Sequence, residues 1–422
     1  MNKIYQNCII ITIFVFVPIL SLFIGFYYDE DLSTGGAQWD FNVTWPVVLD
    51  YSNFNFFEAK TLNLKEPRHF PFHYIILSFF YQIFKQQDLV RLTYLIFSFL
   101  FPVFLYLNLT NIYYNHKKII ILVLSFSFLF FPFYRSSALW PNAHLTALIF
   151  FLISNYFYLK FLKSSNSKCK YLNLLFLAFA TYSLQTYVVI FLFYLYNYFI
   201  LEKKISFFKL ISFCCILGIP PIYFLLQNER MLYLPVTQNY FYNLANNFSI
   251  FFFFLLFLIS NKLNLNIFIT LFKKLKVKEI TFILFFFIIT IYNLDISLLT
   301  ANLRGGGFFF KLSHFILNNN FIFLSSFFCA SFLIYALIKH DRRFLYFFLL
   351  INLMGLNYQI YQKYFEPLFL VMIFTLFNNF LASNILTKFK NVLKFYGIIL
   401  AYFFLSLINV FFGFTKSLTG FL

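Results

Sequence analysis

Three consecutive carboxylates, Asp29, Glu30 and Asp31, follow the first long apolar run of the sequence. A carboxylate at the edge of an apolar region is suited to act as a general base, because it can take the proton of a hydroxyl as that hydroxyl attacks. Like charges crowded together also favour retention of a proton on at least one of them. A solvent-exposed acidic cluster that only ends a helix would have the same sequence, so the cluster by itself leaves both interpretations open.

A second group of polar side chains lies in residues 66–74, which read Glu-Pro-Arg-His-Phe-Pro-Phe-His-Tyr. The candidates for substrate contact in this loop are Arg68, His69, His73 and Tyr74. Pro71 suits the first turn of a helix, where its missing N–H costs nothing. His69 and His73 are four residues apart and could meet on one helix face, but no carboxylate stands at a fixed spacing from them. We therefore predict polar contacts here and no metal site.

The rest of the chain is mostly apolar. Of its 422 residues, 62% are hydrophobic and 11% are charged, and the mean hydropathy is +0.79. Soluble domains carry about 25% charged residues. Apolar runs of about 18 residues or more, long enough to cross a hydrocarbon core of ~30 Å, recur along the chain. The predicted fold class is an all-α integral membrane protein, with residues 1–422 forming a single polytopic membrane domain.

The net charge of +18 does not indicate nucleic-acid binding, because the basic residues form no compact patch interleaved with aromatic side chains. They form short clusters between the apolar runs, which is the pattern that orients a membrane protein. The five cysteines show no spacing typical of a metal site or a disulfide framework.

The lysine and arginine clusters predict the topology. Lys3 and six loops hold 21 of the 32 basic residues, so we place these loops in the cytoplasm, the amino terminus inside and the carboxyl terminus outside.

The apolar run 71–84 is short for a span, and a span there would turn every later Lys-rich loop outward. We predict an interfacial helix near 71–84 within a first outer loop of residues 27–91. The thirteen predicted transmembrane helices are 8–26, 92–114, 119–134, 142–160, 171–184, 186–201, 210–226, 247–261, 279–297, 320–338, 344–356, 365–383 and 395–414.

The other predicted outer loops carry basic side chains, namely Arg135, Arg304, Lys311 and Lys363. An arginine can bind phosphate oxygens through two N–H groups, and cations at a membrane surface attract the phosphate of a lipid. Three glycines follow Arg304 and could let the backbone bend close to such a phosphate. A flexible loop and a solvated basic face are the alternative interpretations of these residues.

The order of these motifs resembles that of the GT-C superfamily of membrane glycosyltransferases, whose donors are polyprenyl- or dolichyl-phosphate sugars. A first helix leads at once to Asp29 and Glu30 and to a long outer loop. A His-x-Pro segment at residues 69–71 then leads an apolar interfacial helix, and Arg91 opens the next helix. This order is similar to that of the protein O-mannosyltransferase and aminoarabinose-transferase branch, which has two prolines where this chain has one.

Other short elements resemble those of the dolichyl-phosphate-glucose glucosyltransferases. They are Gln38-Trp39-Asp40, Gln185-Thr186 and Tyr364-Phe365-Glu366-Pro367. The Pro-Gly-Leu-Tyr element that follows Gln-Trp-Asp in that family is absent from this sequence. The resemblance to the superfamily covers about residues 10–160 and thins after them.

The resemblance implies an inverting glycosyltransferase without a cofactor, although a divalent metal would be compatible with it. The first-loop Asp of the superfamily is the catalytic base, which places this role on Asp29, with Glu30 as a supporting or alternative carboxylate. The donor phosphate would be bound by Arg304, Lys363, Arg135 and Lys311, while Arg91 would anchor its helix at the interface. The expected partners are a polyprenyl-phosphate sugar, an acceptor hydroxyl on a lipid, glycan or protein, and membrane lipids.

Two other classes of membrane protein act on lipid-linked sugars. A lipid-linked sugar flippase or transporter would favour charges or broken helices at mid-membrane, and this sequence shows neither clearly. The candidate for such a charge is Asp295, near the outer end of the ninth predicted span. An O-antigen polymerase or ligase typically has its largest outer loop late in the chain, whereas the largest one here is the first.

The 73 phenylalanines resemble the bias of an AT-rich genome. We expect a bacterial inner membrane with the site facing the periplasm, or the ER membrane in a eukaryote.

Overall fold

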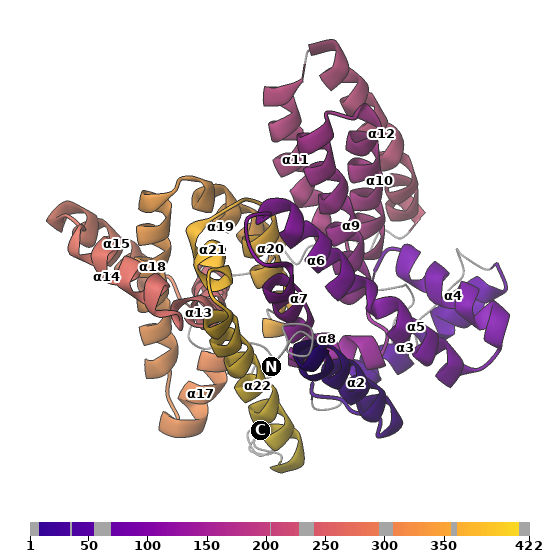
Figure 1. The fold of residues 1–422 in the computed structure, drawn as a ribbon, viewed down its shortest axis with the longest axis horizontal. Helices are drawn as coiled ribbons and strands as arrows, with labels where there is room; N and C mark the ends of the chain where they lie inside the picture. The colour runs from indigo at the N-terminus through magenta and orange to yellow at the C-terminus, as the bar shows by residue number, and fades with distance from the viewer. Residues whose placement is uncertain are drawn as a thin grey trace. The chain divides into compact units, whose positions relative to one another are not determined.

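The computed structural model describes residues 8–33, 36–54, 69–202, 204–227, 240–294, 307–355 and 361–412 (Figure 1). Within these ranges the chain is almost wholly helical and contains no β-strand. It divides into two compact units, residues 1–233 and 234–422. The predicted all-α architecture is confirmed.

The described part of the first unit consists of short and long helices connected by tight turns. Its elements are η1 (Thr12–Phe16), α2 (Val17–Tyr27), α3 (Gly36–Ser52), α4 (Phe72–Phe84), α5 (Gln87–Ser98), α6 (Leu100–Ile112), α7 (Lys118–Ser127), η2 (Phe128–Phe130), α8 (Pro132–Leu139), α9 (Ala143–Ser164), α10 (Ser167–Ser183), η3 (Gln185–Tyr187), α11 (Val188–Leu201) and α12 (Lys204–Gln227).

The described part of the second unit is arranged around one central helix, α13, which packs against most of the others. Its elements are α13 (Tyr240–Ile259), α14 (Lys262–Lys273), α15 (Val277–Tyr292), α17 (Phe308–Leu317), α18 (Phe321–His340), α19 (Arg343–Met354), η5 (Gln362–Tyr364), α20 (Leu368–Thr375), α21 (Phe380–Leu386) and α22 (Phe389–Phe412). Aromatic rings fill its core: Phe251 and Phe254 of α13 stack on Phe369 of α20 at centroid distances of 5.2 and 5.7 Å.

Six helices in the described ranges are long and apolar enough to cross a membrane, and two bent pairs bring the number to eight. They are Cys8–Tyr27, Gln87–Ile112, Ala143–Ser164, Lys204–Gln227, Phe321–His340 and Phe389–Phe412, with the pairs Lys118–Phe130 plus Pro132–Leu139 and Gln362–Thr375 plus Phe380–Leu386. The protein is thus a multi-pass membrane protein. The predicted number of thirteen spans is not confirmed, although a helix occupies each of the predicted segments.

Two of the predicted spans are not straight helices. The first is bent by 70° where Pro132 begins α8, because a proline lacks the N–H that would continue the preceding helix. The second is bent by 89° before α21. There the side chain of Asn379 accepts a hydrogen bond from the N–H of Ala382 at 3.1 Å and starts a new helix. Both bends place helix ends within apolar sequence.

The described residues of the segment predicted as the first outer loop include α4, at the position predicted for an interfacial helix, and α3, which was not predicted. The α4 helix packs on α3, since Gln82 donates to the Ser52 carbonyl at 2.9 Å and the rings of Tyr81 and Trp45 meet edge to face. On the face of α4 opposite its buried residues Tyr74 and Leu77, the side chains of Ile75, Phe79 and Ile83 are 38%, 58% and 56% exposed. An exposed apolar stripe at four-residue spacing fits a helix that contacts lipid.

Side-chain amides lock the long helices of the first unit together. The Asn155 amide of α9 donates to Asn108 of α6 at 3.1 Å, and Tyr194 of α11 donates to the Asn155 oxygen at 2.8 Å. All three side chains are buried. Polar side chains inside a membrane protein bond across helices because lipid offers them no partner.

A second set of bonds ties α10 to its neighbours α9 and α11 (Figure 1). The Asn173 amide donates to the hydroxyl and carbonyl of Ser154 at 2.8 and 3.0 Å. Tyr198 donates to the Asn173 oxygen at 3.0 Å. The Asn173 side chain of α10 therefore bonds groups on two other helices and joins all three.

Replacing Asn173 with leucine should destabilise the first unit, because Tyr198 and the Ser154 carbonyl lose their partner in a buried site. We expect a loss of about 1–3 kcal/mol, seen as a lower thermal midpoint in detergent. Asn197→Leu is the matched control, since its amide donates to the Phe193 carbonyl of its own helix. Equal midpoints for the two variants would contradict the role of Asn173.

Candidate functional site

The acidic cluster begins in the turn that ends α2. The N–H of Glu30 donates to the carbonyl of Gly25 at 2.8 Å, and the N–H of Asp29 donates to Phe26 at 3.2 Å. Asp29 itself has a positive φ of 50°. This pair of bonds around a left-handed residue is the Schellman motif, which satisfies the last carbonyls of a helix.

Asp29 occupies the position of this motif where glycine is usual. A residue with a Cβ pays roughly 1–2 kcal/mol to adopt the left-handed conformation, although Asp tolerates it better than most. A negative charge at a helix carboxyl end is also opposed by the helix dipole. The backbone conformation and the helix dipole therefore both disfavour an aspartate here, and an outlier of this kind is grounds for a functional hypothesis.

Arg91 of α5 holds the Asp29 side chain in place. Its Nη2 donates to Asp29 Oδ1 at 2.7 Å, its Nη1 to Asp88 at 3.1 Å and its Nε to the carbonyl of Leu139 at 3.2 Å. The guanidinium carbon lies 3.5 Å from the ring centroid of Trp140, so the face of the ring stabilises the positive charge of Arg91. Arg91 is buried, whereas the Asp29 side chain is 60% exposed. Among the described residues no donor contacts Asp29 Oδ2, so one carboxylate oxygen remains open to a ligand.

Glu30 is bound quite differently from its neighbour. Its two oxygens accept from Nε and Nη2 of Arg135 at 2.6 and 2.8 Å, a bidentate ion pair. Arg135 also donates to the hydroxyl and the carbonyl of Ser21 at 2.8 and 3.0 Å. The Arg135 side chain is 1% exposed and that of Glu30 15%. This pair joins the end of α2 to α8.

Gly25 makes room for this ion pair. A Cβ at residue 25 would lie 2.8 Å from Glu30 Oε2 and 3.0 Å from Arg135 Nη2. Any larger side chain would push the two charged groups away from α2. A glycine is therefore required at residue 25 because Glu30 and Arg135 lie so close to its backbone, and not because of its own backbone conformation.

Asp31, the third carboxylate, starts the next helix. Its Oδ1 accepts from the N–H and hydroxyl of Ser33 at 2.8 and 2.5 Å, and its Oδ2 accepts from the N–H of Gln38 at 2.9 Å. The predicted crowding of three like charges is thus relieved, because each carboxylate has its own partners. Of the three, Asp29 is the one whose side chain is mostly exposed and has an oxygen free of described donors.

The histidines near α4 make separate contacts. His73 is buried, and its Nδ1 lies 2.8 Å from the hydroxyl of Thr146, which also bonds Tyr94 at 2.8 Å. Burial, with a smaller contribution from the nearby His69, lowers the pKa of His73 to about 3, so the ring is neutral at physiological pH. The His69 ring meets that of His144 edge to face at 5.8 Å. The two histidines do not form the common face that their spacing allowed, because α4 begins at Phe72, after His69.

The other predicted substrate-loop residue in the described ranges, Tyr74, is buried against Tyr51 of α3. Arg68 and Arg304 lie outside the described residues. No group of three or more His, Cys, Asp or Glu side chains that could hold a metal ion occurs in the described ranges.

The predicted phosphate ligands Lys311 and Lys363 belong to the second unit. Gln362 of η5 accepts from the N–H of Phe308 at 2.6 Å, which fixes η5 against the first turn of α17 and brings the backbones that carry the two lysines to the same region. Lys363 lies over the Tyr361 ring at 5.3 Å. Burial lowers the pKa of Lys311. The predicted site residues are therefore divided between the two units.

Sequence reasoning missed the polar core of the second unit. Asn243, Asn246 and Asn247 near the start of α13 are buried, and neither amide atom of Asn246 bonds a described residue. Tyr402 of α22 donates to the buried Glu366 at 2.7 Å and accepts from Gln362 at 2.9 Å. The spacing of the three asparagines, i, i+3 and i+4 in an apolar helix, was the available signal. Arg91 and Trp140 were also underestimated as site residues.

Comparison with known proteins found no match: no protein-family model, no curated protein and no solved structure matches the chain.

Glu30→Gln should be strongly destabilising, because it leaves the Arg135 charge buried without its counterion. Breaking a buried pair from one side costs about 3–5 kcal/mol, so the thermal midpoint of the purified protein should fall markedly. Asp88→Asn is the control, since its carboxylate is 81% exposed and pairs with Arg91 at the surface. We expect less than about 1 kcal/mol from it.

The backbone of residue 29 can be tested by comparing two variants that both lack the carboxylate. Asp29→Gly should be about 1 kcal/mol more stable than Asp29→Ala, because only the alanine strains a left-handed conformation. Thermal unfolding of the two variants measures this difference directly. An alanine variant as stable as the glycine variant would show that residue 29 does not adopt the positive φ.

Proposed function

We propose that the protein is an inverting membrane glycosyltransferase that moves a sugar from a polyprenyl-phosphate donor to an acceptor hydroxyl. The observation that carries the proposal is the state of Asp29. Its carboxylate is largely exposed, fixed by the buried Arg91 through one oxygen, and held in a strained turn at a helix end. These features suit a positioned base: pairing with Arg91 accounts for one oxygen of the carboxylate, and the other oxygen accepts from no described donor.

In this mechanism Asp29 accepts the proton of the acceptor hydroxyl. The acceptor oxygen forms a bond to the anomeric carbon on the face opposite the phosphate. The bond between that carbon and the phosphate oxygen breaks, and the lipid phosphate leaves with the electron pair. The configuration at the anomeric carbon is inverted. The base contributes by removing a proton that would otherwise build up positive charge on the attacking oxygen.

Glu30 and Arg91 are positioning residues in this proposal. The ion pair of Glu30 with Arg135 fixes the turn that carries Asp29, and Arg91 orients the carboxylate. Glu30 does not serve as an alternative base in this scheme, because both of its oxygens accept from Arg135.

Cations that face the donor phosphate would stabilise its charge as it leaves. Arg135 has its Nε, Nη1 and Nη2 engaged with Glu30 and Ser21, so we assign it to the turn and not to the phosphate. Arg304, Lys363 and Lys311 remain the proposed phosphate ligands.

The proposed orientation follows from the charges of the loops. With the Lys-rich loops in the cytoplasm, Asp29 lies on the outer side, which is the periplasmic side of a bacterial inner membrane. The exposed apolar stripe of α4 supports the proposal that this helix lies in the membrane interface. The thirteen-span topology belongs to this proposal.

Asp29→Asn tests the chemistry. The purified wild type, given a panel of radiolabelled polyprenyl-phosphate sugars with membrane lipid extract as acceptor, should transfer label from one donor. Asp29→Asn should reduce the rate by about 100-fold or more, the usual contribution of a general base. Asp88→Asn removes the other carboxylate that contacts Arg91 and should keep the rate close to that of the wild type.

Two results would contradict this proposal. If Asp29→Asn transfers label as fast as the wild type, Asp29 is not the base. If no donor is consumed while liposomes containing the wild type move a labelled lipid-linked sugar across the bilayer, the protein is a flippase and not a transferase.

A further inference from the structure

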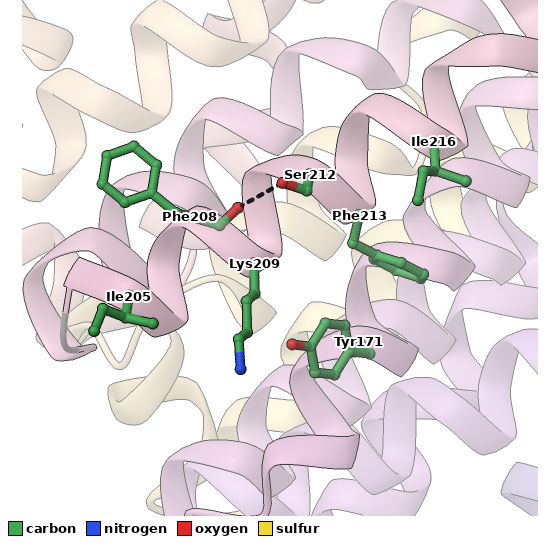
Figure 2. Close-up of a pocket in the computed structure, with 7 residues that line it drawn as sticks. All are labelled: Tyr171, Ile205, Phe208, Lys209, Ser212, Phe213 and Ile216. Atoms are coloured by element: carbon green, nitrogen blue, oxygen red, sulfur yellow. Dashed lines mark hydrogen bonds between the residues drawn. The ribbon is translucent and has the colours of Figure 1, made fainter.

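The described part of the first unit contains an open hollow between α10 and α12 (Figure 2). Its volume is about 530 Å³. The lining is mostly apolar and comes from Tyr171 of α10 and from a run of α12 that includes Ile205, Phe208, Phe213 and Ile216. Ile205, Phe208 and Ile216 are 75%, 65% and 61% exposed. Exposed apolar side chains on a candidate membrane span face lipid, so the hollow opens to the bilayer.

The hollow lies near the basic end of the helix pair. Lys170 donates to Ser206 at 2.7 Å and pairs with Glu202 at 2.9 Å, so the first turns of α10 and α12 lie at the same end. Tyr171 meets Phe213 edge to face at 5.3 Å further along. The positive-inside rule assigns this lysine-rich end to the cytoplasmic face.

One cation at the hollow has no counterion among the described residues. Lys209 lines the hollow, and in Figure 2 its ammonium and the Tyr171 hydroxyl extend into the same space. Glu202 is the only acidic residue between Asp88 and Glu229, and it is paired with Lys170. Lys168 and Lys204, in the first turns of α10 and α12, add positive charge without a described carboxylate partner. The end of the hollow is therefore cationic while its wall is apolar.

We propose that this hollow is a binding site for an anionic phospholipid of the cytoplasmic leaflet. One acyl chain lies along the apolar wall formed by α12 and Tyr171, and the phosphate lies at Lys209. A neutral lipid could fill the same wall but would gain little from the lysines. An anionic lipid satisfies both parts of the site, and the negative cytoplasmic leaflet supplies it. The site is independent of Asp29 and of the proposed transfer reaction.

The test uses the full chain in detergent and needs no enzymatic activity. Native mass spectrometry would measure binding of a phosphatidylglycerol and of a phosphatidylcholine with the same acyl chains. The wild type should retain the anionic lipid preferentially. Lys209→Gln should weaken binding of the anionic lipid by about fivefold, the equivalent of about 1 kcal/mol per lysine, and leave binding of the neutral lipid unchanged.

Two further variants separate the headgroup from the chain. Ser212→Phe places a ring in the hollow without changing charge and should weaken binding of both lipids. Lys262→Gln removes an exposed lysine at the start of α14, in a predicted cytoplasmic loop, and should have no effect. Both variants change exposed positions, so a folded, monodisperse protein is expected from each.

Several outcomes would overturn the proposal. Equal retention of the two lipids by the wild type would show an unselective apolar surface. An equal effect of Lys209→Gln and Lys262→Gln would show attraction by the overall charge and no site. Unchanged binding in Ser212→Phe would show that no chain occupies the hollow. A dimer that Ser212→Phe converts to a monomer would show that a second copy of the chain covers it.

Discussion

The ion pair between Glu30 and Arg135 is the interaction on which the organisation of the first unit most depends. It links residues 105 positions apart in the sequence, with both carboxylate oxygens and most of the guanidinium engaged. Because Arg135 is almost completely buried, removing this counterion would leave its charge in a poorly solvated site. The pair fixes the direction in which the chain leaves α2, and Gly25 and Ser21 are explained by the space and the acceptors it requires.

Two adjacent carboxylates consequently have different roles. Glu30 lies inside and is held on both oxygens, while Asp29 lies outside and is held on one. The difference arises from the Schellman turn, which reverses the chain within two residues and sends successive side chains in different directions. Arg91, stacked on Trp140, completes the arrangement by crossing from α5 to the same turn. An exposed carboxylate held by a buried arginine is the combination expected of a group that must be both accessible and oriented.

Polar contacts also explain how so apolar a chain acquires a defined packing. Lipid-exposed phenylalanines gain nothing from meeting each other in a bilayer, so helix pairing relies on shape and on hydrogen bonds. In the first unit, Asn155 and Asn173 connect four helices through their amides. In the second, Gln362, Tyr402 and the buried Glu366 form a chain of hydrogen bonds. Lys209, which has no counterion among the described residues, is exposed at the hollow where we propose a lipid headgroup.

The sequence by itself determined the helical membrane class, because long apolar runs and sparse charge leave few other solutions. It also placed helices at each predicted span and at 71–84, since hydrophobic length and prolines act locally. It identified the acidic turn but could not distinguish Asp29 from Glu30, because their difference depends on Arg91 and Arg135, which are distant in the chain. The role of Arg135 within the turn and the burial of His73 likewise depend on neighbours that only tertiary packing provides. The angles of the bends before α8 and α21 were also beyond the sequence pattern, because length and hydropathy do not report the direction of a helix. The helix α3 was missed because it is less apolar than the predicted spans and contains Pro46. Residue types and their spacing determine the local conformation that each segment prefers. The partners of a charged side chain come from distant segments, so only the tertiary structure determines them.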